Sequence, residues 1–287
     1  MARTNPSSAT ASPAGSSTPD LPAPGGLCAI HQPNFLPRLT TLAKLFAADY
    51  WIVLDDVQFT RRDYQHRALL PAPGEAEGRR WLTIPTHLPH GRQTAICEAL
   101  IVDADLARRR TAGILRQTYR SSPHWPAFEE ALQQVLAAFD TGRTAAVAET
   151  STRVLLDLLG WQGKILSSSR LPARPGRSQR LADLAAATGA RAYLCGTGGM
   201  KYLQPQLFTT RSITVTHFTP PPLGIWAAGR RDSAITPLMA LGPAALADEV
   251  KAVASRDDLH PAAKTPRLLS PLEGVQTNVL NRVRLRA

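Results

Sequence analysis

An apolar strand, a proline-bracketed polar elbow and an amphipathic helix follow one another early in the sequence, and this order constrains the fold most. Residues 27–30 form a short apolar run after two glycines, which is typical of a buried strand. Pro37 fits the first turn of a helix, where a missing N–H costs little. Apolar residues then recur at helical spacing, namely Leu39, Leu42, Leu45 and Phe46. Residues 50–54 are aromatic and β-branched, so we predict a second strand and a parallel β-α-β unit.

Polar side chains follow both strands of this unit. His31 and Gln32 come directly after the first strand, and Asn34 stands two residues further on. Asp55 and Asp56 come directly after the second strand. In an open parallel sheet, ligands bind beyond the carboxyl ends of the strands, so these groups should share one rim. We therefore expect a functional site at this rim.

The rest of the sequence continues the α/β pattern with two interruptions. Two short strand-like runs at 68–70 and 81–85 predict a hairpin with a longish loop, and residues 95–102 predict a further strand. A helical block at about 103–160 is expected to form a lobe or a cap over the rim. The other expected elements are strands at 164–166, 192–195 and 213–217 and helices at 103–121, 126–140, 144–159, 179–188, 234–241 and 244–254.

This pattern predicts an α/β fold with a mainly parallel, Rossmann-like sheet, flanking helices, a small β-hairpin insertion and a helical lobe. Residues 1–26 are Ser, Thr, Ala, Pro and Gly with almost no large apolar side chains, so we expect a disordered tail. A single domain is expected at 27–256. Residues 257–287 thin into proline, arginine and polar residues and are expected to be a partly ordered tail.

Charge and cysteine content narrow the classes of function. Lys and Arg number 33 against 22 for Asp and Glu, a formal charge of +11, which favours anionic partners such as nucleotides, sugar phosphates, tRNA or acidic lipid surfaces. A composition rich in Arg, Ala, Pro and Leu explains the excess equally well. The three cysteines form neither a disulfide framework nor a zinc-spaced cluster. There is no secretory signal and no apolar run long enough to span a bilayer, so we expect a cytoplasmic protein.

Several short motifs occur in an order that resembles one known family. They are His-Gln-Pro-Asn-Phe-Leu-Pro at 31–37, Asp-Asp-Val-Gln-Phe at 55–59, Trp-Leu-Thr-Ile-Pro at 81–85, and the segments 167–169, 193–196 and 201–203. In this combination the chain resembles the WbqC-like protein family over about residues 27–245. Members of that family are encoded in clusters for O-antigen, capsule and natural-product biosynthesis, so the resemblance implies a biosynthetic role. The sequence departs from the family pattern at Arg38, at 66–68 and at Thr236.

The elbow and the carboxylate pair are the leading candidates for function. A helix start offers free N–H groups and positive potential, so His31, Gln32 and Asn34 suit the binding of a phosphate or carboxylate. Alternatively, the side chains of Gln32 and Asn34 only form hydrogen bonds with the backbone of a tight turn. Asp55 or Asp56 could bind a divalent ion, act as a general base or orient an amine. Only one of the two faces the rim, because side chains alternate along an extended segment. The alternative is an ordinary turn at the end of a strand.

Other segments supply further candidates. Arg61, Arg62 and Arg67 could clamp an anion, although runs of charge are usually solvated faces. The glycines of Gly-Thr-Gly-Gly at 196–199 allow a ligand to approach the backbone, or simply form a tight turn. The candidate binding residues are Gln32, Asn34, Gln58, Arg62, Arg67, Gly196, Gly199, Lys201 and Tyr202.

The leading hypothesis is a biosynthetic transferase that acylates or aminoacylates an amine, such as an amino sugar. His31 and Asp55 or Asp56 are the candidate catalytic residues, and the elbow and the arginines hold an anionic small-molecule donor, with tRNA as a possible partner. The alternatives are a nucleotide-dependent ligase or nucleotidyltransferase, and a non-catalytic binding or scaffold subunit. Cys195 is conceivable as a nucleophile, although buried cysteine is more often a core residue. The sequence names no cofactor, metal or oligomeric state.

Overall fold

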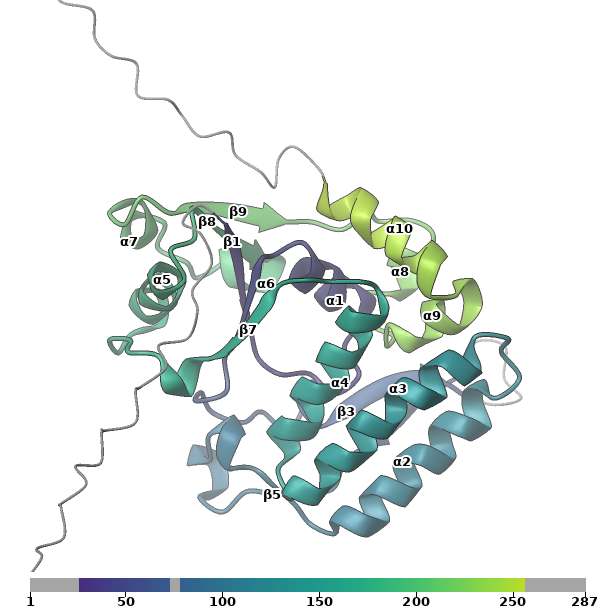
Figure 1. Ribbon diagram of the computed structural model, residues 1–287. Coiled ribbons are helices and arrows are strands. Elements are labelled where there is room, and N and C mark those ends of the chain that lie inside the picture. Colours follow the sequence, from purple (N-terminus) through teal and green to yellow (C-terminus); the bar gives the residue numbers. More distant parts are fainter. Residues whose placement is uncertain (1–25, 73–77, 256–287) are drawn as a thin grey trace, which may run out of the picture.

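Five parallel strands form the central sheet of the computed structural model, which describes residues 26–72 and 78–255 (Figure 1). They are β1 (Leu27–His31), β2 (Tyr50–Val53), β7 (Lys164–Ser167), β8 (Ala192–Gly196) and β9 (Thr214–Phe218). Their order in the sheet is β7-β2-β1-β8-β9, and every pair is parallel. The chain builds outward from β1 to β7 and then returns to the other side of β1, so the strand order reverses between β1 and β8. The predicted α/β fold is confirmed.

Helices cover both faces of this sheet. One face carries α1 (Leu39–Phe46), α4 (Thr144–Leu158) and α10 (Pro243–Ala254), and the other carries α5 (Arg177–Ala187) and α7 (Gln206–Thr209). Leu27 and Ala29 of β1 pack into the first core, whereas Cys28 and Ile30 pack into the second. Successive side chains of a strand point to opposite faces, so a strand covered on both sides must be apolar throughout. This requirement explains the uninterrupted apolar runs of β1 and β2.

The helical segment packs onto the sheet through the first core. It consists of α2 (Ala104–Tyr119), α3 (Trp125–Ala137) and α4, which lie side by side in Figure 1. Leu115 and Phe128 are buried in the same cluster as Trp51 of β2. The N-cap of α2 is Asp103, whose carboxylate accepts a hydrogen bond from the backbone N–H of Leu106 (2.9 Å). The predicted hairpin is also present, as the antiparallel pair β3 (Arg67–Pro71) and β4 (Arg79–Thr83).

Two sequence predictions about local structure need correction. Residues 95–102 are not a single strand, because they form a 3-10 turn at Ile96–Glu98 followed by β6 (Leu100–Ile101), which pairs with β5 (Thr86–His87). The Glu98 carboxylate accepts a hydrogen bond from the backbone N–H of Ala95 at 2.8 Å and closes the turn. Pro37 precedes the helix instead of lying in its first turn, since Arg38 is the N-cap of α1.

The sequence pattern did not indicate α6 (Thr197–Met200), α7 or α8 (Ile225–Ala228), each of which is too short to show a helical period. It did indicate α9 (Ile235–Leu241). Nearly all of the two predicted tails, at 1–26 and 257–287, lies outside the described residues. None of the helices that the structure describes is both long and apolar enough to pass through a bilayer.

The elbow after β1 adopts a conformation that the helical segment supports. Leu36 is fully buried with a φ of 47°, in the left-handed region that branched apolar residues rarely adopt. Its backbone N–H donates to the hydroxyl of Ser151 on α4 (2.9 Å). The hydroxyl of Thr152 donates to the backbone carbonyl of Asn34 (2.9 Å). Helix α4 therefore fixes the path of the chain between His31 and α1.

We predict that Ser151→Ala lowers the free energy of unfolding by about 1–3 kcal/mol, because the buried N–H of Leu36 loses its acceptor. Urea denaturation followed by circular dichroism measures the change. The matched control is Thr209→Ala, which removes an exposed hydroxyl bonded only to Gln206 within α7, and its effect should stay within about 0.5 kcal/mol. Equal effects of the two substitutions would contradict the role of Ser151.

Candidate functional site

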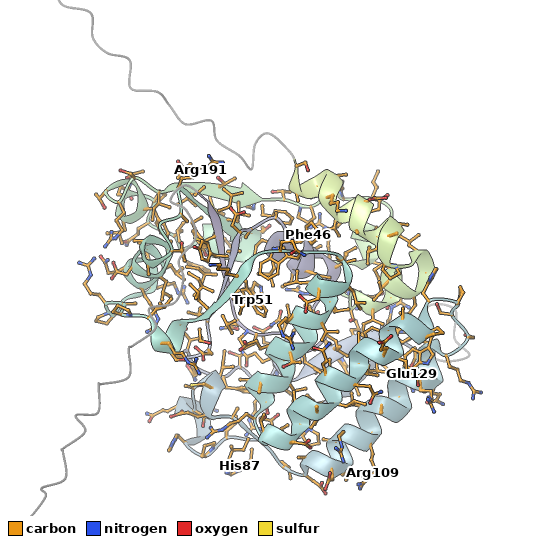
Figure 2. The ribbon with its side chains drawn as sticks, viewed as in Figure 1. Phe46, Trp51, His87, Arg109, Glu129 and Arg191 are labelled. Atoms are coloured by element: carbon orange, nitrogen blue, oxygen red, sulfur yellow. The ribbon has the colours of Figure 1, made fainter. Side chains whose placement is uncertain are left out.

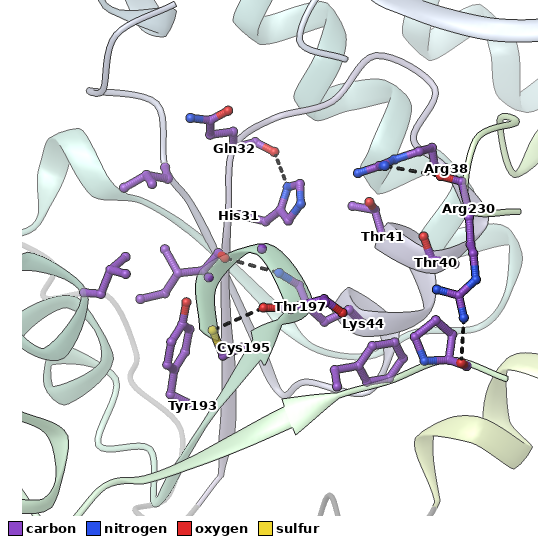
Figure 3. Close-up of a pocket in the computed structure, with 18 of the residues that line it drawn as sticks. His31, Gln32, Arg38, Thr40, Thr41, Lys44, Tyr193, Cys195, Thr197 and Arg230 are labelled. Atoms are coloured by element: carbon purple, nitrogen blue, oxygen red, sulfur yellow. Dashed lines mark hydrogen bonds between the residues drawn. The ribbon is translucent and has the colours of Figure 1, made fainter. Parts of the chain in front are cut away.

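A cavity of about 650 Å³ opens where the strand order reverses, between the carboxyl ends of β1 and β8 (Figure 3). Its volume lies within the usual range for small-molecule sites, and its position is the one that ligands occupy in open parallel sheets. Its polar lining comes from the end of β1, the start of α1, the loop between β2 and β3, the turn after β8 and the loop before α9: His31, Gln32, Arg38, Thr40, Thr41, Lys44, Asp63, Thr197 and Arg230. Segments from distant parts of the chain therefore meet at this point.

His31 is the last residue of β1, and its ring lies in the wall of the cavity. Burial lowers the pKa of His31 well below its usual value, and the positive charge of Lys44 lowers it further. The imidazole is therefore neutral. Nδ1 lies 2.8 Å from the carbonyl oxygen of Gln32, which can only accept a hydrogen bond, so Nδ1 carries the proton. Nε2 is left with a free lone pair and can accept a proton.

Lys44 projects from α1 toward the end of β1 and is 94% buried, since only 6% of its surface is exposed. Its Nζ donates to the carbonyl of Ile30 at 3.4 Å, a long hydrogen bond. No carboxylate in the described part of the chain forms an ion pair with it. Burial therefore lowers the pKa of Lys44 to about 8, although the neighbouring Cys195 opposes the shift. The amine is thus partly neutral near physiological pH.

Two arginines stand at the mouth of the cavity. Arg38 donates to the backbone carbonyl of Arg230 (3.2 Å), and Arg230 donates to that of Pro220 (3.3 Å). The guanidinium of Arg38 also lies over the ring of Tyr64, 4.3 Å from its centroid. Among the described residues, Asp63 is the one carboxylate in the lining. The cavity therefore has an excess of positive charge, which suits an anionic ligand.

Asp55 and Asp56 do not line this cavity and instead form a cluster with the turn after β7 and with α5. Asp55 accepts hydrogen bonds from the backbone N–H of Ser169 (3.0 Å) and from its hydroxyl (2.8 Å). Asp56 pairs with Arg180 of α5 and lies 2.5 Å from the hydroxyl of Ser168. Both carboxylates thus have protein partners. No group of His, Cys, Asp and Glu among the residues that the structure describes is arranged to hold a metal ion.

The structure separates the other predicted site residues. Gln32, Gly196 and Gly199 line the cavity with His31. The other predicted binding residues lie outside its lining. Asn34 is buried, Gln58 donates a hydrogen bond to the carbonyl of Arg92, and Arg62 is exposed. Arg67 lies over the ring of Trp81, and Lys201 and Tyr202 follow α6. Cys195 lines the cavity but is 1% exposed. Burial raises the pKa of its thiol, which makes it an unreactive core residue.

Sequence reasoning missed Lys44, Arg38 and Arg230. Lys44 did leave a signal, because it interrupts the apolar face of a short helix between Ala43 and Leu45. Arg38 appeared only as a departure from a family motif. Arg230 follows a short helix far along the chain, and no local pattern links it to the first strand.

Fold and site together define a Rossmann-like α/β protein with a cationic cavity at the switch point of its sheet. The chain belongs to the WbqC-like protein family, whose model matches residues 32–224. It is 24% identical over 190 residues to "Uncharacterized protein Rv1507c" of Mycobacterium tuberculosis (strain ATCC 25618 / H37Rv). The matched residues make up 66% of this chain and 80% of that protein. No solved structure gave a significant match. Membership of the family suggests a protein of a biosynthetic pathway.

The two partly buried histidines, His31 and His66, predict a loss of stability in acid. Burial lowers the pKa of His66 to about 4, and the pKa of His31 is also low, whereas both rings protonate near pH 6.5 in the unfolded chain. The unfolded state therefore binds more protons below about pH 6.5, so the free energy of unfolding falls as the pH drops. We predict that His66→Phe, which keeps the stack on Phe59, makes this fall smaller between pH 6.5 and 4. Denaturation curves across this range measure the slope, and an unchanged slope contradicts the assignment.

Proposed function

We propose that this protein is a biosynthetic transferase that binds an anionic small-molecule donor in the switch-point cavity. One observation carries the proposal, namely that the cations Lys44, Arg38 and Arg230 share a cavity to which, among the described residues, only Asp63 contributes a carboxylate. Lys44 is buried in the cavity wall, so water screens its charge less than it screens a surface charge. A phosphate or carboxylate group is the chemistry that this arrangement favours.

The proposed reaction is transfer of an acyl or aminoacyl group to an amine, such as that of an amino sugar. The amine nitrogen bonds to the acyl carbon, and the bond from that carbon to the leaving group breaks with its electron pair. Nε2 of His31 accepts the proton that the nitrogen loses and then returns it to the leaving group, so the ring ends neutral. Arg38 and Arg230 hold the anionic part of the donor, since their guanidinium groups stay charged at any working pH.

Asp55 and Asp56 take a positioning role in this proposal. Their oxygens are engaged by Ser168, Ser169 and Arg180, so neither carboxylate is free to take a proton from an amine in the cavity. They join the ends of β2 and β7 instead and stabilise the edge of the rim next to His31. Of the three candidate catalytic residues His31, Asp55 and Asp56, we therefore keep His31.

A nucleotide-dependent ligase is the second candidate, and the strand order favours it. Numbered along the chain, the five parallel strands have the order 3-2-1-4-5, which is found in nucleotide-binding Rossmann sheets. This candidate requires turnover that depends on ATP and magnesium and releases pyrophosphate or phosphate. A binding or scaffold subunit requires ligand binding without turnover by the purified protein.

We predict that an anionic donor raises the melting temperature of the protein and that Arg230→Met abolishes the rise. A thermal-shift panel of nucleotides, nucleotide sugars, acyl-CoA thioesters and tRNA, with and without magnesium, tests this. Binding to the folded state alone stabilises it by about 2.7 kcal/mol at a hundredfold excess over Kd. The control is Arg109→Met, which removes an exposed arginine of α2 (Figure 2) and should keep the shift. A shift with tRNA alone, strongly weakened by salt, would instead indicate a tRNA partner.

We predict that His31→Gln lowers kcat about a hundredfold or more once a substrate pair is found, because a general base typically contributes a factor of this size. The same variant should keep the thermal shift with the donor, which shows that it folds and binds. Asp55→Asn serves as the comparison. It should lower the melting temperature of the protein and leave kcat nearly unchanged. Full turnover by His31→Gln would exclude His31 as the base.

A further inference from the structure

Lys44 is a buried amine of α1 that forms no ion pair with a carboxylate in the described part of the chain. The chain has five lysines against a large excess of arginines, and they stand at positions 44, 164, 201, 251 and 264. Lys164, Lys201 and Lys251 are exposed, whereas Lys44 is 6% exposed and lines the cavity. A cation meant only to attract an anion works equally well as arginine, which cannot lose its proton. A buried lysine can lose its proton and become a nucleophile.

The surroundings of Lys44 favour the neutral amine. The titratable or charged groups near it are Cys28 and His31 of β1, Cys195 of β8, and Arg38 at the start of α1. Burial keeps both thiols protonated and His31 neutral, and Arg38 repels a second positive charge. Within the described part of the chain, the one hydrogen bond of Lys44 is the long one to the carbonyl of Ile30. No carboxylate of the described residues therefore holds the proton on the amine.

We infer that Lys44 is a covalent nucleophile that forms an imine with an anionic aldehyde or ketone held in the switch-point cavity by Arg38 and Arg230. The amine nitrogen adds to the carbonyl carbon, and a proton moves from nitrogen to oxygen to give a carbinolamine. Loss of that oxygen as water leaves a carbon–nitrogen double bond, so no oxidant or reductant is needed. The inference rests on the proposed role of the cavity as a site for an anionic ligand, and it does not depend on acyl transfer.

Arg38 and Arg230 also lie where they could hold the anionic group of a ligand that reaches Lys44. Arg38 and Arg230 lie at the mouth of the cavity and are joined by a hydrogen bond, while Lys44 lies deeper, beside the ends of β1 and β8 (Figure 3). A ligand bound by its anionic group at the arginines would extend its other end toward the amine. Gly196, whose added Cβ would lie 3.9 Å from Cδ of Lys44, borders the lysine side chain without blocking it.

Reductive trapping tests the inference. The full-length protein is incubated at pH 7.5 with pyridoxal phosphate as the probe, treated with sodium borohydride, digested and mapped by mass spectrometry. We predict that Lys44 is labelled at least about tenfold faster than the exposed Lys251, because an amine of ordinary pKa, about 10.4, is almost entirely protonated at this pH. Pyridoxal, which lacks the phosphate, should label Lys44 more slowly. Pyruvate as a third probe shows whether a carboxylate replaces the phosphate.

Matched variants separate this inference from the proposed function. Lys44→Met should abolish the adduct, and Lys251→Met should leave the adduct at Lys44 unchanged. Arg230→Met should slow labelling by pyridoxal phosphate but not by pyridoxal. Labelling of Lys44 no faster than Lys251, together with an intact donor-induced thermal shift, overturns the imine and leaves the cavity as an anion site. Loss of both the labelling preference and the thermal shift overturns the proposed function as well.

Discussion

Parallel pairing of β1 with strands on both sides is the constraint on which the rest of the structure depends. His31 pairs in register with Val53 of β2, and Cys28 pairs with both Tyr50 and Tyr193. The connections leave β1 in one direction and return to β8 in the other, so the loops at the carboxyl ends of β1 and β8 diverge. A crevice at this point follows from topology alone. The sequence then decides which side chains fill it.

Burial explains the electrostatic character of that crevice better than net charge does. Most arginines in the described part of the chain are exposed, where solvent and salt screen them. Lys44 and His31 are shielded from water, and desolvation is the main cause of both pKa shifts. Lys44 therefore combines a weakly held proton with a position in a cavity that attracts anions. A lysine in an exposed surface patch of equal charge would attract anions but would not be desolvated.

The sequence was most informative where structure is local. Continuous apolar runs located β1 and β2, and helical periodicity located α1 and the three helices of the helical segment. It also indicated the rim at which the cavity lies, through His31, Gln32 and the glycines at 196–199. It could not show that Asp55 and Asp56 turn toward β7, or that Arg230 reaches the cavity. Those contacts join segments more than a hundred residues apart, and pairing across such distances leaves no periodic signal.

Two sets of polar side chains lie at the rim, the carboxylates Asp55 and Asp56 and the cavity residues Lys44 and His31. They differ in whether their hydrogen-bonding capacity is satisfied within the protein. Asp55 and Asp56 are surrounded by serine hydroxyls, a backbone N–H and an arginine, so their cluster is complete without a ligand. Lys44 has one long hydrogen bond, and Nε2 of His31 has a free lone pair. Groups left incomplete in a buried cavity are destabilising by themselves, and a ligand that completes them offsets that loss. The cavity between β1 and β8 is therefore the part of the rim where we propose that a ligand binds, and the acidic cluster lies beside it as a structural element.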